Sequence, residues 1–443
     1  MKRRMTALLL CAALLAALGV NAATAERPKE EETPAVTAAV SDEAAPDEDG
    51  ALSLSHLRAQ MLESYYPLLA IEESIRMLDE LNYESMEKDL RDTLNAIADM
   101  QWASISASAS ALDPAAMAGM TPAQIAGAAG ASAASAVVSP VVTSQLQTQY
   151  DACKEAFDKV HKGELQADNE GVKRQLRNLQ DQTVIMAETL FITCKGLDAQ
   201  DTALARTIAA LERTEKELTL RNQLGQVSAL TLQQVSVGLS QARSGRQTLR
   251  MNRDNLLLQL KAMCGAALDA PLNLGALPRV SAAQLAAMDM EADLAAAREV
   301  SYELYDAKKT YDDAKKDYDD ARDKYGDYSG KNEWMQAKHS WQAAQYTYEN
   351  AKQSFELRFR ALYAQVKDAA QVLDAKRAAV SAQEQSYAAD SLRFKQGSIS
   401  ANALADARDQ LAEAKDAAAS AERDLYTQYH NYENAVTYGI LNS

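Results

Sequence analysis

The sequence contains few residues that end helices. Of 443 residues, only 17 are glycine and 9 are proline. No proline lies between Pro140 and Pro271, and none follows Pro278, so two long stretches contain no residue that forbids a helix. A β-sandwich, a barrel or a layered α/β enzyme needs many more turn residues than this. The scarcity therefore predicts an all-α protein with unusually long helices.

The sequence also lacks the usual signatures of nucleic-acid binding and catalysis. The formal charge is −16, and no cluster of lysine and arginine alone follows the first residues, so we expect no nucleic-acid partner. Glycine-rich phosphate loops, nucleophile elbows and paired-cysteine motifs are absent. The four histidines are scattered along the chain: His56, His161, His339 and His430. We therefore expect no enzyme, no catalytic residues, no cofactor and no metal site.

The first 25 residues have the pattern of a signal peptide. Residues 2–4 are basic, and an apolar run from Ala7 to Val20 is followed by small residues, including Ala25. This pattern predicts cleavage between Ala25 and Glu26. The run is too short to span a membrane, and no later stretch reaches the roughly 18 apolar residues that a span needs. We expect an exported protein of the cell envelope, outside the cytoplasmic membrane; association with an outer membrane stays open.

Three cysteines remain after the signal peptide: Cys153, Cys194 and Cys264. If the chain forms a helical hairpin at 224–225, Cys264 faces a residue near 186. That position lies about 12 Å from Cys194, at 1.5 Å per residue, which is too far for a disulfide. We expect buried free thiols. The remaining cysteine, Cys11, follows three leucines rather than a small residue, which disfavours lipid attachment.

Composition and periodicity divide the chain into segments. Residues 26–50 are acidic and hold no large apolar residue, which predicts a disordered leader. Helical periodicity runs from Leu52 to Met100, with Pro67 as a kink or restart. Next comes an Ala/Ser-rich insert, 101–145, with one charged residue. It is either a flexible loop or, over 102–145, an element that contacts a membrane, a cell-wall polymer or sister protomers.

The rest of the chain reads as long helices separated by short breaks. The first helical stretch ends at Leu224–Gly225, the next runs from Ser228 to Cys264–Gly265, and a connector follows over 271–281. The second half is expected to form helices over 282–325, 334–395 and 401–438. Over 304–325 and 334–355, tyrosine or tryptophan recurs every seven residues, with an alanine between each two. This seven-residue repeat predicts that the two segments form an antiparallel hairpin.

The two halves are related by an internal duplication, 51–270 and 282–443. The pair Ser64–Tyr65 resembles Ser301–Tyr302. Six residues of the first half recur in the second at a constant spacing of 172: Leu220, Gly225, Ser228, Leu232, Leu239 and Ala242 match Leu392, Gly397, Ser400, Leu404, Leu411 and Ala414. In both copies a glycine can end one helix and the serine three residues later can cap the next, so each copy predicts a tight helical turn.

This repeat resembles the TolC family of outer-membrane efflux proteins from residue 51 onward. The segments that carry the resemblance run from Leu224 to Gly265 and from Gln396 to Gly439. The resemblance implies two short helices end to end beside one long helix, and a homotrimer enclosing a helical tunnel. It also implies that the turns at Leu224, Gly225, Ser228, Gly397 and Ser400 dock a periplasmic-type adaptor, which joins a passive duct to an inner-membrane pump.

The chain departs from the family pattern at two places. The break at 326–333 is too short for a pair of membrane-spanning strands, so we expect a TolC-like helical protomer without the family's β-barrel. A gating aspartate of the family falls on Asp406, but the acidic position before it is Ala403 here and Thr231 in the first copy. The alternative function is a structural coiled-coil scaffold or adaptor of the envelope without transport activity.

Overall fold

The computed structural model describes residues 51–110, 146–326 and 331–441. The chain divides into two units, Met1–Glu43 and Ala44–Ser443, and the described residues lie in the second. The expected signal peptide, its cleavage residues Ala25 and Glu26, and the acidic leader lie outside the described residues, as does 111–145 of the insert.

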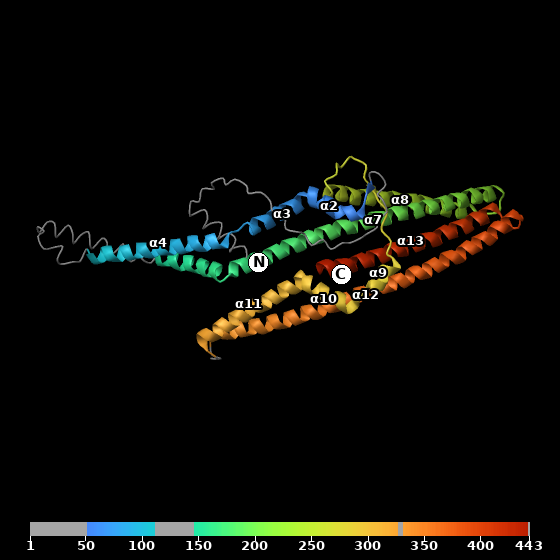
Figure 1. The fold of residues 1–443 in the computed structure, drawn as a ribbon. Coiled ribbons are helices and arrows are strands. Elements are labelled where there is room, and N and C mark those ends of the chain that lie inside the picture. The colour runs from blue at the N-terminus through green and yellow to red at the C-terminus, as the bar shows by residue number, and fades with distance from the viewer. Residues whose placement is uncertain (1–50, 111–145, 327–330, 442–443) are drawn as a thin grey trace, which may run out of the picture. The chain divides into compact units, whose positions relative to one another are not determined.

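The described residues confirm an all-α fold built on two long helices, α7 and α12 (Figure 1). The first half contains α2 (Leu54–Ser64), α3 (Tyr66–Asp79), α4 (Tyr83–Ser110), α7 (Glu164–Gln223) and α8 (Ala229–Met263). The second half contains α9 (Ala282–Ala287), α10 (Met290–Val300), α11 (Tyr302–Tyr325), α12 (Asn332–Lys395) and α13 (Ala401–Tyr438). Two short parallel strands, β1 (Ala51–Leu52) and β2 (Asn273–Leu274), pair beside the first half. At 60 and 64 residues, α7 and α12 are each about 90 Å long.

Each long helix has short helices along it, as the duplication predicts. In the first half α7 packs against α8 toward one end and against α2 and α3 further along. In the second half α12 packs against α13 and α11 in the corresponding way (Figure 1). The aromatic seam between α11 and α12 is confirmed, because the Tyr318 ring stacks on Trp341 at 4.9 Å and the Tyr311 ring stacks on Tyr348 at 5.9 Å.

Several predicted boundaries are wrong. The stretch 52–100 is three helices: α3 begins at Tyr66 and confirms the restart expected at Pro67, whereas the break at 80–82 was not predicted. The stretch 282–325 is also three helices, because Ser281, Asp289 and Ser301 accept backbone N–H bonds as N-caps. Finally, α4 continues to Ser110, into the expected insert, since alanine and serine do not end a helix as proline does.

Each half has its own apolar core. The first core joins β1, α2 and α3 to α7 and α8, and contains Leu57, Met61, Leu68, Val184, Phe191 and Leu260. The second joins α10 and α11 to α12 and α13, and contains Leu294, Leu304, Phe355, Phe359, Val366, Leu425 and Tyr432. The hydrophobic stabilisation of the fold is therefore supplied mainly within each half.

A glycine–serine contact recurs where each half closes. Gly265, just after α8, has φ +65° and lies against Ser64, whose hydroxyl donates to the Cys264 carbonyl at 2.8 Å. Gly439, just after α13, also has φ +65° and lies against Ser301, where an added Cβ would come within 2.4 Å of the backbone. The resemblance of Ser64–Tyr65 to Ser301–Tyr302 thus reflects one structural joint that occurs twice.

Within the described residues, no helix is long and apolar enough to cross a membrane.

Candidate functional site

The predicted turn at Gly225 is a tight connection between α7 and α8. Gly225 has φ +71°, and the Gln226 amide donates to the Arg221 carbonyl at 2.8 Å. This hydrogen bond is the 6→1 bond of a Schellman motif. Ser228 then caps α8, because its Oγ accepts the Thr231 amide at 3.2 Å. Nothing lies within 4 Å of the place where a Cβ of Gly225 would stand, so the backbone angle and not space requires glycine.

The turn at Gly397 repeats this geometry between α12 and α13. Gly397 has φ +72°, and the Ser398 amide donates to the Arg393 carbonyl at 2.9 Å. Ser400 caps α13 by accepting the Ala403 amide at 3.2 Å. Both Gly-x-x-Ser segments are therefore helix–turn–helix connections, as the sequence predicts, and their role in docking stays a prediction.

Large apolar side chains are exposed around both turns. Leu224 is 63% exposed and Leu230 64% exposed at the first turn. Leu220 before the first turn and Leu392 before the second, which match at the spacing of 172, are both 59% exposed. Exposed leucines in equivalent places on two copies of one turn indicate a contact surface rather than isolated exceptions.

Arginines on α8 fix the register of the first hairpin. Arg246 and Arg250 both donate to Asp201 on α7, and these hydrogen bonds hold the pKa of the Asp201 carboxyl far below its usual range. Arg253 donates to Asp198 at 3.0 Å. This ladder was not predicted, although arginines three or four residues apart, opposite acidic residues at the hairpin's spacing, are the signal for it.

The three cysteines of the described residues, Cys153, Cys194 and Cys264, are buried and free, as predicted. The hairpin register keeps Cys264 away from Cys194, and burial raises the pKa of all three thiols, that of Cys264 to about 11. A thiol that stays protonated at neutral pH is a poor nucleophile and a poor metal ligand.

Ion pairs between α7 and α13 join the two hairpins. Arg213 donates to Asp409, and its guanidinium also lies 3.6 Å from Asp406. The hydrogen bond to Asp409 raises the pKa of Arg213. Two further contacts of this seam are Arg206 with Asp416, and Asn402, whose Nδ2 donates to Glu217 at 2.8 Å. Sequence reasoning missed them because the partners are almost 200 residues apart.

Asp406, the predicted gate residue, lies at the edge of this α7–α13 seam. Its carboxylate is 68% exposed, while the neighbouring Asp409 makes the shorter contact with Arg213. The structure thus places Asp406 beside a contact between hairpins, and its role as a gate stays a prediction.

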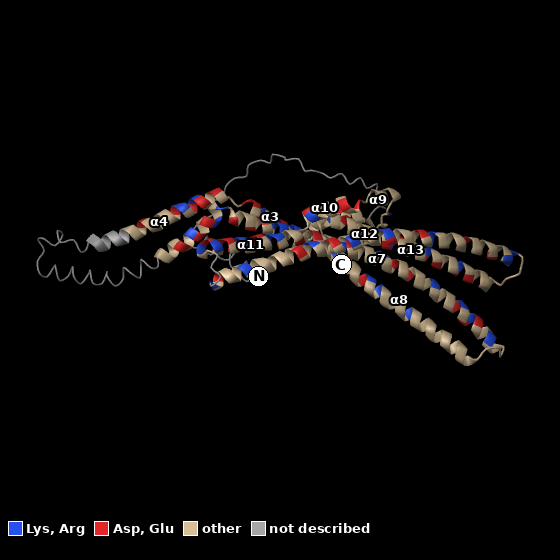
Figure 2. Cartoon of the chain, turned by 90° about the horizontal axis from the view of Figure 1, so that it is seen from below, with Lys and Arg blue, Asp and Glu red and all other residues tan. Residues whose placement is uncertain are grey.

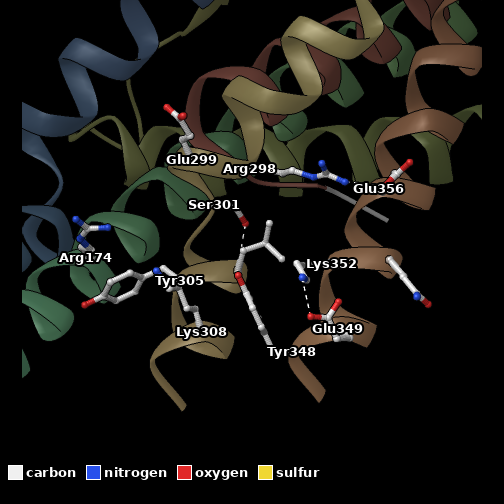
Figure 3. A pocket seen from close by; sticks show the side chains of 12 residues that line it. Arg174, Arg298, Glu299, Ser301, Tyr305, Lys308, Tyr348, Glu349, Lys352 and Glu356 are labelled. Atoms are coloured by element: carbon white, nitrogen blue, oxygen red, sulfur yellow. Dashed lines mark hydrogen bonds and ion pairs between the residues drawn. The ribbon is translucent and has the colours of Figure 1, made fainter. Parts of the chain in front are cut away.

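A hollow of about 580 Å³ lies where α7, α10, α11 and α12 meet (Figure 3). Four of its charged side chains form two pairs, Arg298 with Glu356 and Lys352 with Glu349, each at 2.7 Å. Arg174 reaches in from α7 over the Tyr305 ring. Among the described residues, no group of three or more histidine, cysteine or acidic side chains could hold a metal ion.

Comparisons with known proteins find similarity in solved structures alone. No family model and no curated protein matches the chain. The outer-membrane channel OprN is 12% identical, with 88% of this chain and 90% of that chain covered and a TM-score of 0.48. A membrane protein from Pseudomonas aeruginosa is also 12% identical, and the match covers 92% of this chain and 99% of that chain with a TM-score of 0.48. The channel protein CusC is 13% identical, and the match covers 66% of this chain and 89% of that chain with a TM-score of 0.43.

These similarities agree with the resemblance read from the sequence. Because the three TM-scores are below 0.5, they add no independent weight, and the fold rests on the helices of this chain itself. The chain is an all-α protein of two repeated helical hairpins, each built on one long helix.

A glycine at a close-packed joint and a glycine at an open turn should lose different amounts of folding free energy when replaced by alanine. Gly439→Ala adds a Cβ to a left-handed residue and drives it into the Ser301 backbone, so we expect a loss of about 2–5 kcal/mol in the free energy of unfolding. Gly397→Ala meets no neighbouring atom and should cost about 1 kcal/mol through its backbone angle alone. Denaturant titration of the two variants measures both. Equal losses would show that the Gly439 joint is not tightly packed.

Proposed function

We propose that this chain is one protomer of a TolC-like homotrimeric helical duct in the cell envelope, which serves an efflux or secretion system as a passive conduit. The observation that carries the proposal is the repeated turn. Two long hairpins end in the same capped glycine turn, and an exposed leucine precedes each turn at the equivalent position, Leu220 and Leu392. The turns at Leu224, Gly225, Ser228, Gly397 and Ser400 then dock a periplasmic-type adaptor, and an inner-membrane pump supplies the energy.

Exposed apolar side chains on the long helices support assembly with further copies. Leu179 and Met186 on α7 lie seven residues apart, two turns along one face, and both are about half exposed. Leu357 on α12 is 69% exposed. Two hairpins do not close a tube by themselves, whereas three copies supply six hairpins, and sister protomers then cover these faces.

The α7–α13 seam suggests how such a duct would open. Near the turns its ion pairs are partly or largely exposed, and an exposed ion pair contributes only about 0–1 kcal/mol. The turns themselves are tightly capped, so each hairpin moves as a unit. Opening therefore requires the loss of a few weak contacts between hairpins rather than unfolding of either one.

A trimer is tested by crosslinking at the proposed gate. Asp406→Cys places a thiol on an exposed helix face beside the seam, while the native thiols are buried. Treatment of the purified chain with a trivalent maleimide should give covalent trimers. Asp374→Cys, exposed on α12, is the matched control and should give fewer. Monomers alone at micromolar concentration would refute the trimer. Assemblies without a central channel would favour the alternative, a structural coiled-coil scaffold of the envelope.

We further propose that the end of α4 next to the insert contacts a membrane surface. Charged residues are frequent along α4 (Figure 2). Between Asp99 and Asp151 the sequence holds one further charge, Asp113. Met100 is half exposed and Trp102 is 72% exposed at this end. Tryptophan favours the membrane–water interface because its ring is apolar and its N–H is polar.

Trp102 reports on this contact directly. Trp334 is buried and Trp341 is half-buried against Tyr318, so lipid vesicles carrying a brominated acyl-chain quencher should reduce mainly the Trp102 emission of the full chain. Trp102→Ser should lower flotation with vesicles several-fold, whereas Tyr66→Ser, which removes an aromatic ring 84% exposed on α3, should leave it unchanged. The absence of both quenching and flotation would contradict membrane contact. Binding to isolated cell-wall polymer instead of vesicles would contradict it as well.

A further inference from the structure

Charged contacts, rather than apolar ones, dominate the interface between the two repeats. The first core draws on residues from Leu52 to Leu277, and the second on residues from Val280 to Leu441. Tyr426 on α13 crosses this division, because it packs against the first core. The side chain that stacks on the Tyr426 ring is His430, at 5.8 Å and nearly parallel.

His430 makes a buried contact with the first repeat. Its Nε2 lies 2.9 Å from Oε2 of Glu188 on α7, and the two side chains are only 16% and 10% exposed. Every ion pair of the α7–α13 seam near the turns is more exposed than this one. A buried pair is the more sensitive to loss of a charge, because the carboxylate left behind has little water around it.

The surrounding groups leave Glu188 short of positive charge. Asp181 lies two turns earlier on the same face of α7, and Arg58 from α2 hydrogen-bonds to Asp181 and stacks over the Tyr438 ring of α13. Burial raises the pKa of Asp181, as does the charge of Glu188, while Arg58 opposes both. Burial also raises the pKa of Tyr438, so this tyrosine stays neutral. Glu433, the next acidic residue of α13, is exposed.

We propose that His430 and Glu188 form a proton-operated clasp between the two repeats. When His430 carries its second proton, two carboxylates face two cations and the cluster is neutral. When that proton leaves, Asp181 and Glu188 share Arg58 alone, and a buried carboxylate loses its counter-charge. Histidine is the side chain whose charge ordinarily changes between pH 5 and 8. The clasp therefore holds α13 to α7 in mildly acidic medium and loosens as the pH rises.

This inference concerns how the repeats are joined and does not require that the protein conduct anything. It is tested first by thermal unfolding of the full chain at pH 6 and pH 8, at constant ionic strength. The wild-type Tm should fall by roughly 2–4 °C more over this interval than that of His430→Gln, which has no proton to lose. Glu188→Gln, which keeps a hydrogen-bonding partner for neutral His430, should also lack this part of the pH dependence.

A second histidine supplies the matched control. His161 lies 3.0 Å from Glu87, but its side chain is 59% exposed and the pair lies within the first repeat. His161→Gln should keep the wild-type difference between pH 6 and pH 8. If His430→Gln and Glu188→Gln also keep it, the clasp does not exist.

A distance measurement covers the case in which the variants fail to fold. Spin labels on Thr207→Cys of α7 and Ala419→Cys of α13 occupy exposed positions on either side of the seam, and the native thiols are buried. In an otherwise wild-type chain the distance distribution should broaden from pH 6 to pH 8. Identical distributions at the two pH values would overturn the proposal even if no variant could be purified.

Discussion

The separation of the apolar cores is the constraint on which the rest of the structure depends. Each long helix buries its apolar face against short helices of its own repeat, through Phe191 in the first and Phe355 with Phe359 in the second. Because burial of such side chains is the main source of stability, each repeat holds together without much help from the other. Apart from Tyr426 of α13, which packs against the first core, charged side chains along α7, α11 and α13 join the repeats (Figure 2).

The joints, the turns and the contacts between the hairpins have different structural roles. The joints at Gly265 and Gly439 are close-packed, so they fix the short helices on the long ones. The turns at Gly225 and Gly397 are open on all sides, so a partner can reach the exposed leucines without disturbing the core. Between them, weak ion pairs and the buried His430–Glu188 contact set how far the hairpins separate. Rigid hairpins with an adjustable contact between them suit a conduit that opens and closes.

Much of the fold could be predicted from the sequence because its signals are local. The absence of proline from long stretches predicts α7 and α12, and the duplicated Gly-x-x-Ser predicts both turns. The restart predicted at Pro67 is confirmed by the break at Tyr65, whereas the break at Ser301 was missed because a single extended residue between helices leaves no strong local signal. The capping box at Ser281 and Gln284, by contrast, is a local signal that sequence reasoning passed over. The seam and the clasp were beyond reach, since Arg213 and Asp409 are 196 residues apart and Glu188 and His430 are 242 apart.

The most direct test of the account is electron microscopy of the purified chain. The account predicts a hollow particle with threefold symmetry, in which the long helices line a central channel and the turns at Gly225 and Gly397 gather at one end. A solid rod, or a monomer at the concentrations used for imaging, would contradict it.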